Sequence, residues 1–458
     1  MNKQTWLLSM VGVLYIAAFF PAFDWSLQIK AAAVLVIIQI LWIGRVFPLA
    51  YSSVLLILLL SFHFFSYDET LSYFGSGLVW LLFSTFILAH AFITTGLASR
   101  VSLFILSLSR GSSKLLILVS FLLMFVLTVF IPSNIGKGSL ISSILHDISR
   151  SLQRIQPSRH IATTLFIGIT YVCAISAAFV PTGASSTIYA FGIFSDLSDK
   201  VTYLHWLLYF GVPILVFVGL LWLIFNLFFP AEDVDPSVVK NLITSKFSEL
   251  GPWSAKEKKM ALIMVVTLSL WVTQPLHGYS IPLVGLLGAS MVVLPYIGVM
   301  TWEAAKEGVN WDMMIFFAAT LMLSNMLIDT GTIDHVVDYL VAHSHDYPSI
   351  ILVIGLIVIT ALIRIIFVNV LGFLTIMLPM AVTLGDELAG VTSLTLAMAV
   401  YLIGVPGFLL ITQSPVHLIS YSYGYFTERE LLRVGTVAMA VWIVIIFVTM
   451  TMYWNLVI

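Results

Sequence analysis

Charged side chains are scarce in this sequence. Asp, Glu, Lys and Arg make up 9% of the 458 residues, whereas hydrophobic residues make up 60%. A soluble globular domain carries roughly a quarter charged residues. Many uncharged runs reach the length of about 20 residues that an α-helix needs to cross a bilayer. A transmembrane barrel would show short alternating segments instead. The composition therefore predicts an all-α polytopic membrane protein, with about 11 transmembrane helices.

Cysteine is almost absent, since Cys173 is the single one and lies in an apolar run. This excludes a disulfide framework and a cysteine metal site. We find no nucleophile–base pair, metal-ligand cluster or phosphate-binding loop, so we expect no catalytic residues, no resident metal or other cofactor, and no nucleic-acid partner. The N-terminus, residues 1–30, has the shape of a signal peptide without a small-residue cleavage pattern. It is predicted to be a retained first helix.

One stretch combines helix breakers with a lysine in an apolar setting, IPSNIGKGSLISSIL, residues 131–145. It follows the uncharged run 115–130, and proline and glycine break a helix at that point. We expect a re-entrant hairpin over residues 115–149, because broken backbone at membrane depth must be buried in protein or line a wet cavity. Ser133, Asn134 and Lys137 are then candidate ligands of a small anionic substrate.

Three interpretations of Lys137 follow from the sequence. The side chain binds a substrate carboxylate, stands in for a missing cation, or points from a wide hairpin mouth into water. An arm helix is also expected just before the hairpin, at Leu97–Arg110. It either lies along the membrane surface or extends a helix that packs on protein.

A second uncharged stretch, residues 161–195, is interrupted by hydroxyl-bearing and small residues, PTGASST. It is too long for one straight span and too short for two. We expect a broken helix, in which unwound carbonyls and hydroxyls face a coupling ion. The candidate ion ligands are Ser133, Asn134, Thr182, Gly183, Ser185 and Ser186. The alternative is a tilted helix whose small residues allow close packing.

The second half of the chain repeats the first. Gly96 and Gly331 lie 235 positions apart, and so do Asn134 and Asn369. Internal symmetry of this kind is typical of secondary transporters. We predict a first inverted repeat at 31–230, a cytoplasmic linker at 231–259 and a second repeat at 260–458. The second repeat contains an arm at Ile333–His345, a hairpin at 350–384 and a broken helix at 388–426.

The placement of Lys and Arg favours one orientation. With the N-terminus in the cytoplasm, most of them fall on the cytoplasmic side, and Lys30 and Lys200 fall outside. Because positive residues concentrate on the inner side, we predict a plasma or inner membrane protein with a cytoplasmic N-terminus and an external C-terminus. The surrounding lipid bilayer is then its main partner.

The sequence resembles the divalent anion/sodium symporter family of the wider ion transporter superfamily. The matching stretches are FILAHAFITTGLASRVSLFIL, IPSN, SLWVTQPLHGYSIPLVGLLGASMVVLPYIGVMTWEAAKEGVNWDMMIFF and SPVHLISYSYGYFTERELLRVG. The resemblance implies paired inverted repeats, a homodimer, an elevator-like transport movement and a substrate carboxylate held at two hairpin tips. It also implies a sodium ion beside each tip.

The chain departs from the pattern of this family at three places. Ile135 replaces a threonine at the first tip, and Val368 and Val370 replace a serine and a threonine beside Asn369. The second broken helix reads QSPVH from position 413, where Gly-Thr-Pro-Pro-Asn is typical. Ser414 and Pro415 remain candidate substrate ligands there. The loss of two hydroxyls weakens the case for a second sodium site.

Two further groups have two interpretations each. His417 is either a protonatable coupling group or a hydrogen-bonded packing residue. Arg364 is either an anion contact or a structural ion. Our first hypothesis is a secondary active transporter of small anions, such as di- or tricarboxylates, working by symport or exchange. The alternatives are a non-transporting receptor or sensor, and a cation exchanger. The latter would normally need an intramembrane carboxylate, which both tips and both broken helices lack.

Overall fold

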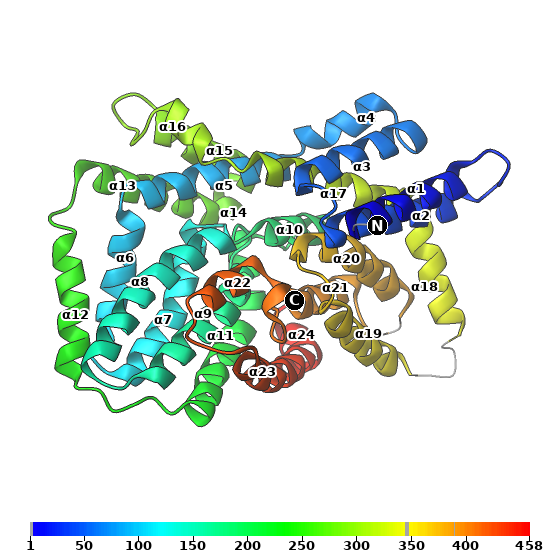
Figure 1. Ribbon diagram of the computed structural model, residues 1–458. Helices are drawn as coiled ribbons and strands as arrows, with labels where there is room; N and C mark the ends of the chain where they lie inside the picture. The colour runs from blue at the N-terminus through cyan, green and yellow to red at the C-terminus, as the bar shows by residue number, and fades with distance from the viewer. Residues whose placement is uncertain (1–2, 344–347, 389) are drawn as a thin grey trace. The chain divides into compact units, whose positions relative to one another are not determined.

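The structure is a computed structural model that describes residues 3–343, 348–388 and 390–458. Position 389 of the predicted second broken helix and the end of the predicted second arm lie outside the described residues. Within the described ranges every regular element is a helix, as Figure 1 shows. The predicted all-α fold class is therefore confirmed.

The first half of the chain, up to the polar linker, contains eleven α-helices and one 3₁₀ turn in the described residues. These elements are α1 (Lys3–Phe19), α2 (Leu27–Gly44), α3 (Leu49–His63), α4 (Tyr67–Ser72), η1 (Tyr73–Gly75), α5 (Gly77–Thr94), α6 (Leu97–Ser107), α7 (Ser113–Phe130), α8 (Asn134–Ile155), α9 (Arg159–Ala177), α10 (Ser185–Leu197) and α11 (Tyr203–Phe228).

The linker contributes one helix, and the second half follows with the remaining elements. These are α12 (Pro236–Glu249), α13 (Ala255–Val272), α14 (Gln274–His277), α15 (Ile281–Val293), α16 (Trp302–Glu307), α17 (Trp311–Asp329), α18 (Thr332–Ala342), α19 (Ser349–Ile363), α20 (Val370–Glu387), α21 (Ser393–Gly404), η2 (Ile411–Gln413), α22 (Pro415–Ser422), α23 (Glu428–Val448), η3 (Thr449–Tyr453) and α24 (Trp454–Val457).

Among the described residues, eight helices are long and apolar enough to cross a membrane. They include α7 and α20, which the sequence predicts to be the arms of re-entrant hairpins. The structure thus agrees with a polytopic membrane protein. The expected count of about 11 spans, and the re-entry of the two hairpins, stay predictions.

The predicted repeat is visible in the order of the elements. α5 is joined to α6 at Gly96, and α17 is joined to α18 at Gly331. Both glycines have left-handed backbone, with φ of 87° and 66°, which glycine adopts without a steric penalty. A hairpin, a broken helix and a long terminal helix then follow in each half. The opposite membrane orientation of the two repeats stays a prediction.

The chain divides into two compact units, each of which draws on both halves of the sequence. The first unit comprises residues 1–80 and 310–401, and in it α17 packs against α3 and α20. The second unit comprises residues 81–309 and 402–458. In the second unit α9 packs against α7 and α8, and all its residues from Ile161 to Ala177 are buried. α9 is therefore a central helix of that unit.

Candidate functional site

The first hairpin tip is the turn between α7 and α8. Ile131 and Ser133 have extended backbone on either side of Pro132, so the helix is interrupted as the sequence predicts. The Ser133 hydroxyl accepts a hydrogen bond of 3.1 Å from the backbone N–H of Gly136. A serine in this position caps a helix by satisfying one of its free N–H groups. The tip thus presents the N-terminus of a 22-residue helix, with Asn134 as its first residue.

Lys137 lies one turn into α8, and its side chain is buried, with 0% exposed. Its ammonium group donates hydrogen bonds to the hydroxyl of Thr128 on α7 and, at 3.1 Å, to the hydroxyl of Ser176 on α9. Thr128 in turn donates a hydrogen bond of 2.9 Å to Ser176. The interpretation in which Lys137 points into water is therefore wrong, because two hydroxyls draw the side chain into the protein.

The free cysteine lies next to this cluster. The Cys173 thiol donates to the backbone carbonyl of Asn134 at 3.3 Å, and the Cys173 carbonyl accepts a hydrogen bond of 2.9 Å from Ser176. α9 therefore contacts both the tip and the partners of Lys137. The sequence interpretation missed Thr128, Ser176 and Cys173 as site residues. The available signal was that Thr128 is one of only two polar residues in the run 115–130.

The first broken helix is confirmed as an interruption between α9 and α10. The bend packs tightly, because a Cβ added to Gly183 would lie 2.2 Å from the carbonyl oxygen of Ala177 and 2.8 Å from a methyl carbon of Thr128. Thr187 closes the bend with a hydrogen bond of 2.9 Å to the same Ala177 carbonyl. Of the predicted ion ligands, Thr182, Gly183 and Ser186 are buried, and Ser185 is half-buried. The structure thus brings the bend beside Thr128, the partner of Lys137.

The second broken helix enters the same compact unit. α22 begins at Pro415 and packs against α8 and α9. Its approach to α8 is close, since a Cβ added to Gly138 would lie 2.8 Å from a methyl carbon of Val416. Ser414 caps α22, and its hydroxyl accepts a hydrogen bond of 3.3 Å from the Val416 N–H. The first turns of α8 and α22 therefore lie side by side.

The segment before α22 is fixed by side chains that fold back on the backbone. The Gln413 side-chain oxygen accepts hydrogen bonds from the backbone N–H groups of Leu409 and Leu410, at 2.8 and 2.9 Å. His417 is buried, and its Nδ1 lies 3.0 Å from the Leu410 carbonyl oxygen. That contact requires a proton on Nδ1. These bonds favour the packing interpretation of His417, although its coupling role stays untested.

The second hairpin tip belongs to the other compact unit, so it is described within that unit. Asn369 caps α20, and its side-chain oxygen accepts a hydrogen bond of 2.9 Å from the Leu371 N–H. Arg364 is buried, and its guanidinium donates to the Phe367 carbonyl. Arg364 thus contacts the backbone of the tip turn. The meeting of the two tips at one substrate stays a prediction.

The comparisons with known proteins agree with this architecture. The family model described as the sodium:sulfate symporter transmembrane region matches residues 2–458. A membrane protein of Cupriavidus necator is 22% identical over 82% of this chain and 74% of its own length. A citrate/succinate antiporter of Escherichia coli K12 is 23% identical over 80% of this chain and 76% of its own length.

A solved structure has a similar fold. The YdaH transporter of Alcanivorax borkumensis matches with a TM-score of 0.56 and 11% identity, and the match covers 85% of this chain and 88% of that one. At this identity the likeness supports the fold alone. The family model, however, spans almost all of the chain, and its region includes both hairpins and both broken helices. This chain therefore belongs to the sodium:sulfate symporter family of membrane transporters.

Proposed function

We propose that this chain is a secondary active transporter of small carboxylate anions and that the first hairpin tip binds one end of the substrate. The observation that carries this proposal is the buried ammonium of Lys137, in the same first turn of α8 as Asn134 and its cap Ser133. The stretches that form the tip and the two broken helices contain no Asp or Glu. A site with one buried positive charge and no carboxylate favours an anion.

Two helix N-termini add to this preference. The first turns of α8 and α22 lie side by side at Gly138 and Val416. The N-terminus of a helix carries a partial positive charge and N–H groups without a partner in the helix. Such ends bind carboxylates and phosphates. The amide of Asn134 and the hydroxyls of Ser133 and Ser414 supply further hydrogen-bond donors.

A carboxylate substrate is also supported by a relative, because the citrate/succinate antiporter of Escherichia coli K12 carries such anions by name. In our proposal Asn369 at the second tip binds the other end of the substrate. The family resemblance then implies that both tips move together in an elevator-like step, in a homodimer.

For the coupling we propose exchange rather than sodium symport. The amino group of Lys137 is held by Thr128, and Thr128 also contacts the bend at Gly183. A sodium ion bound by Thr182, Gly183, Ser185 and Ser186 would therefore sit close to a positive charge. Two like charges at short range inside a protein cost several kcal/mol. Lys137 would act on the anion through its charge and take the place of the ion.

The test is transport by the purified protein in liposomes. Vesicles loaded with unlabelled citrate, succinate or malate are diluted into labelled succinate, with sodium or with choline as the external cation. We expect uptake only into loaded vesicles, at the same rate in both cations. Uptake into empty vesicles that requires sodium would overturn the exchange proposal. Binding of a carboxylate without uptake under any condition would overturn the transport proposal.

A further inference from the structure

The polar linker at 231–259 contains a helix, and this helix is bound to the first half of the chain. At its start, both carboxylate oxygens of Glu232 accept hydrogen bonds from the backbone N–H groups of His160 and Ile161, at 2.6 and 3.0 Å. The Asp235 N–H donates to the side-chain oxygen of Gln156 at 3.2 Å. The linker is thus anchored at the start of α9.

The middle of the linker contacts the first hairpin. α12 packs against α8 and α6, and Figure 1 shows it running beside them. Lys246 of α12 forms an ion pair of 2.7 Å with Asp147 of α8. A Cβ added to Gly111, just before α7, would lie 2.1 Å from the Pro236 carbonyl oxygen. α12 therefore joins the hairpin helices to the arm helix α6.

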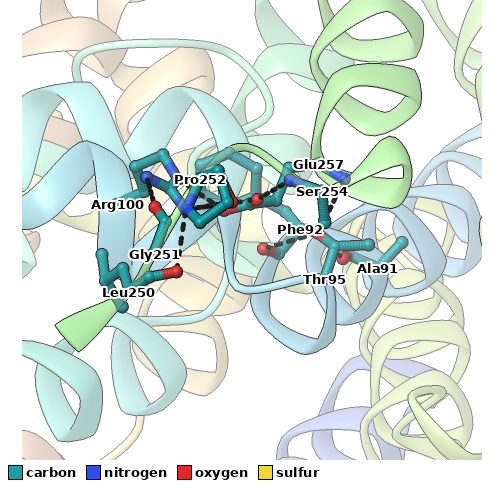
Figure 2. A network of polar contacts seen from close by, with 9 residues as sticks. All are labelled: Ala91, Phe92, Thr95, Arg100, Leu250, Gly251, Pro252, Ser254 and Glu257. Atoms are coloured by element: carbon teal, nitrogen blue, oxygen red, sulfur yellow. Dashed lines mark hydrogen bonds and ion pairs between the residues drawn. The ribbon is translucent and has the colours of Figure 1, made fainter. Parts of the chain in front are cut away.

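The end of the linker receives a buried arginine from the arm. Arg100 of α6 is 5% exposed, and its Nε lies 2.6 Å from Oε1 of Glu257, which is also 5% exposed. The rest of its guanidinium donates to backbone carbonyls, shown in Figure 2: those of Leu250, Gly251 and Pro252. Trp253 covers one face of the guanidinium at 5.2 Å.

Glu257 is itself held in place by the start of α13. One of its oxygens accepts a hydrogen bond of 2.6 Å from the Ser254 N–H, and the Ser254 hydroxyl accepts one of 3.1 Å from the Glu257 N–H. This reciprocal arrangement is a capping box, which fixes both residues. A buried ion pair with such partners has a fixed geometry, and the loss of one member leaves an uncompensated charge.

The corresponding position of the second arm carries no such pair. Arg100 aligns with His335 at the repeat spacing of 235. Within the described part of the chain, the recorded ion pairs include none from α18. The anchor of α6 is therefore a feature of one repeat. It depends on the linker, which occurs once in the chain.

We propose that Arg100 and Glu257 are positioning residues that lock the arm α6 to the junction between the linker and α13, so that α6, α12 and the first hairpin move as one body. This inference rests on the proposed transport function. Gly96, which has left-handed backbone, is then the joint between α5 and the locked body. The lock sets how fast the hairpin changes position and leaves the substrate affinity unchanged.

The variants for the test are Glu257→Gln and the conservative change Glu257→Asp, which keeps a carboxylate for Arg100 and for the Ser254 N–H. Arg159→Gln is the matched control, because Arg159 pairs with Glu430 at 3.2 Å while its side chain is 74% exposed. Exposed pairs of this kind contribute little to stability. Each protein is measured for amide hydrogen exchange, substrate affinity and the rate of succinate exchange in liposomes.

In Glu257→Gln we expect hydrogen exchange to rise about tenfold in both α6 and α12, because local opening of a packed unit is a shared event. We also expect a maximal transport rate reduced about tenfold, with the half-saturating succinate concentration within about twofold of wild type. Glu257→Asp should lose less than Glu257→Gln in both measurements, and Arg159→Gln should match wild type.

Three outcomes would overturn the inference. The first is faster hydrogen exchange in α6 of Glu257→Gln with no change in α12. The second is a normal transport rate despite faster hydrogen exchange in both helices. The third is a weaker substrate affinity at an unchanged maximal transport rate. Hydrogen exchange needs no transport activity, so the one-body claim is tested even if the chain carries no carboxylate. If the wild-type protein does not transport succinate, the proposed function and the predicted effect on the transport rate are both overturned. The hydrogen-exchange measurement then decides by itself whether α6 and α12 move as one body.

Discussion

The ammonium of Lys137 lies 3.1 Å from the hydroxyl oxygen of Ser176, although the two residues are 39 positions apart. A lysine on α8 is thus bound to a serine on the central helix α9. Thr128 of α7 completes the group, so the three helices around the first tip share one buried charge.

Replacing Lys137 with methionine should leave a folded protein that binds anions poorly. A buried charge can be replaced by an apolar side chain at little cost in stability. A unit charge about 8 Å from a carboxylate contributes about 2 kcal/mol at an effective dielectric of about 20, so affinity should fall on the order of 30-fold. Thermal-shift titration with succinate measures this change in affinity.

Lys200→Gln, at an exposed lysine, serves as the control for Lys137→Met. Equal affinity of Lys137→Met and wild type would contradict the role of the charge.

The two tip asparagines should both be needed for substrate binding. Asn134 is the first residue of α8, and Asn369 caps α20. A ligand that binds only the native state stabilises it, by about 2.7 kcal/mol at a hundredfold excess over Kd, and so raises the melting temperature. We expect Asn134→Ala and Asn369→Ala each to abolish this rise for carboxylates. Full ligand-induced stabilisation in both variants would rule out the two-tip site.

The contact between Gly138 and Val416 should tolerate no extra methyl group. A Cβ at Gly138 would lie 2.8 Å from Val416, so Gly138→Ala should destabilise the protein by about 1–3 kcal/mol through overpacking. Adding Val416→Ala should restore much of the loss, because the obstructing atoms belong to that side chain. At Gly183 the obstruction is the Ala177 backbone oxygen, at 2.2 Å, so Gly183→Ala should have no comparable rescue. A double variant no more stable than Gly138→Ala would refute the contact.

The ion pair of Glu257 predicts a dependence of stability on pH. Burial raises the pKa of this carboxyl, but hydrogen bonds from Arg100 and Ser254 outweigh burial and hold the pKa below its usual 4.5. A lowered pKa in the folded state stabilises the protein above the unfolded value, and this contribution disappears as pH falls through the folded pKa. Glu257→Gln, which leaves the buried Arg100 without its partner, should therefore cost roughly 3–5 kcal/mol near neutral pH.

The melting temperatures of wild type and Glu257→Gln, measured from pH 7 downward, check this prediction. Their difference should be constant above pH 4.5 and shrink below it. A difference that grows on acidification would mean that the pKa is raised in the folded protein. The variant Glu430→Gln, at a partly exposed pair, should show a much smaller difference at every pH.

Local sequence signals predicted most of the helices and their interruptions. Pro132 and the two following glycines mark the first tip, and the shared spacing of Gly96 and Gly331 indicates the repeat. These features depend on backbone preferences of single residues, which act over one or two turns. For that reason the arm α6 and the first broken helix lie within a few residues of the predicted positions.

The partners of Lys137 could not be predicted in the same way. Whether its side chain faces water or protein depends on Thr128 and Ser176, which come from two other helices. Both are ordinary hydroxyl residues in apolar runs, where such residues more often bond their own helix. The lock at Arg100 was hidden for the same reason, since Glu257 is 157 positions away in a stretch that reads as a polar linker.

The single thiol of the chain has a practical consequence. Cys173 is buried and donates its hydrogen bond to the Asn134 carbonyl, at the tip of the first hairpin. A maleimide or methanethiosulfonate reagent can reach this buried sulfur only when the packing of α9 against its neighbours, α8 of the tip included, opens. The rate of labelling at Cys173 therefore reports opening around α9 and the tip in the unmodified protein, without an engineered cysteine. A bound substrate that holds the tip closed will slow that labelling.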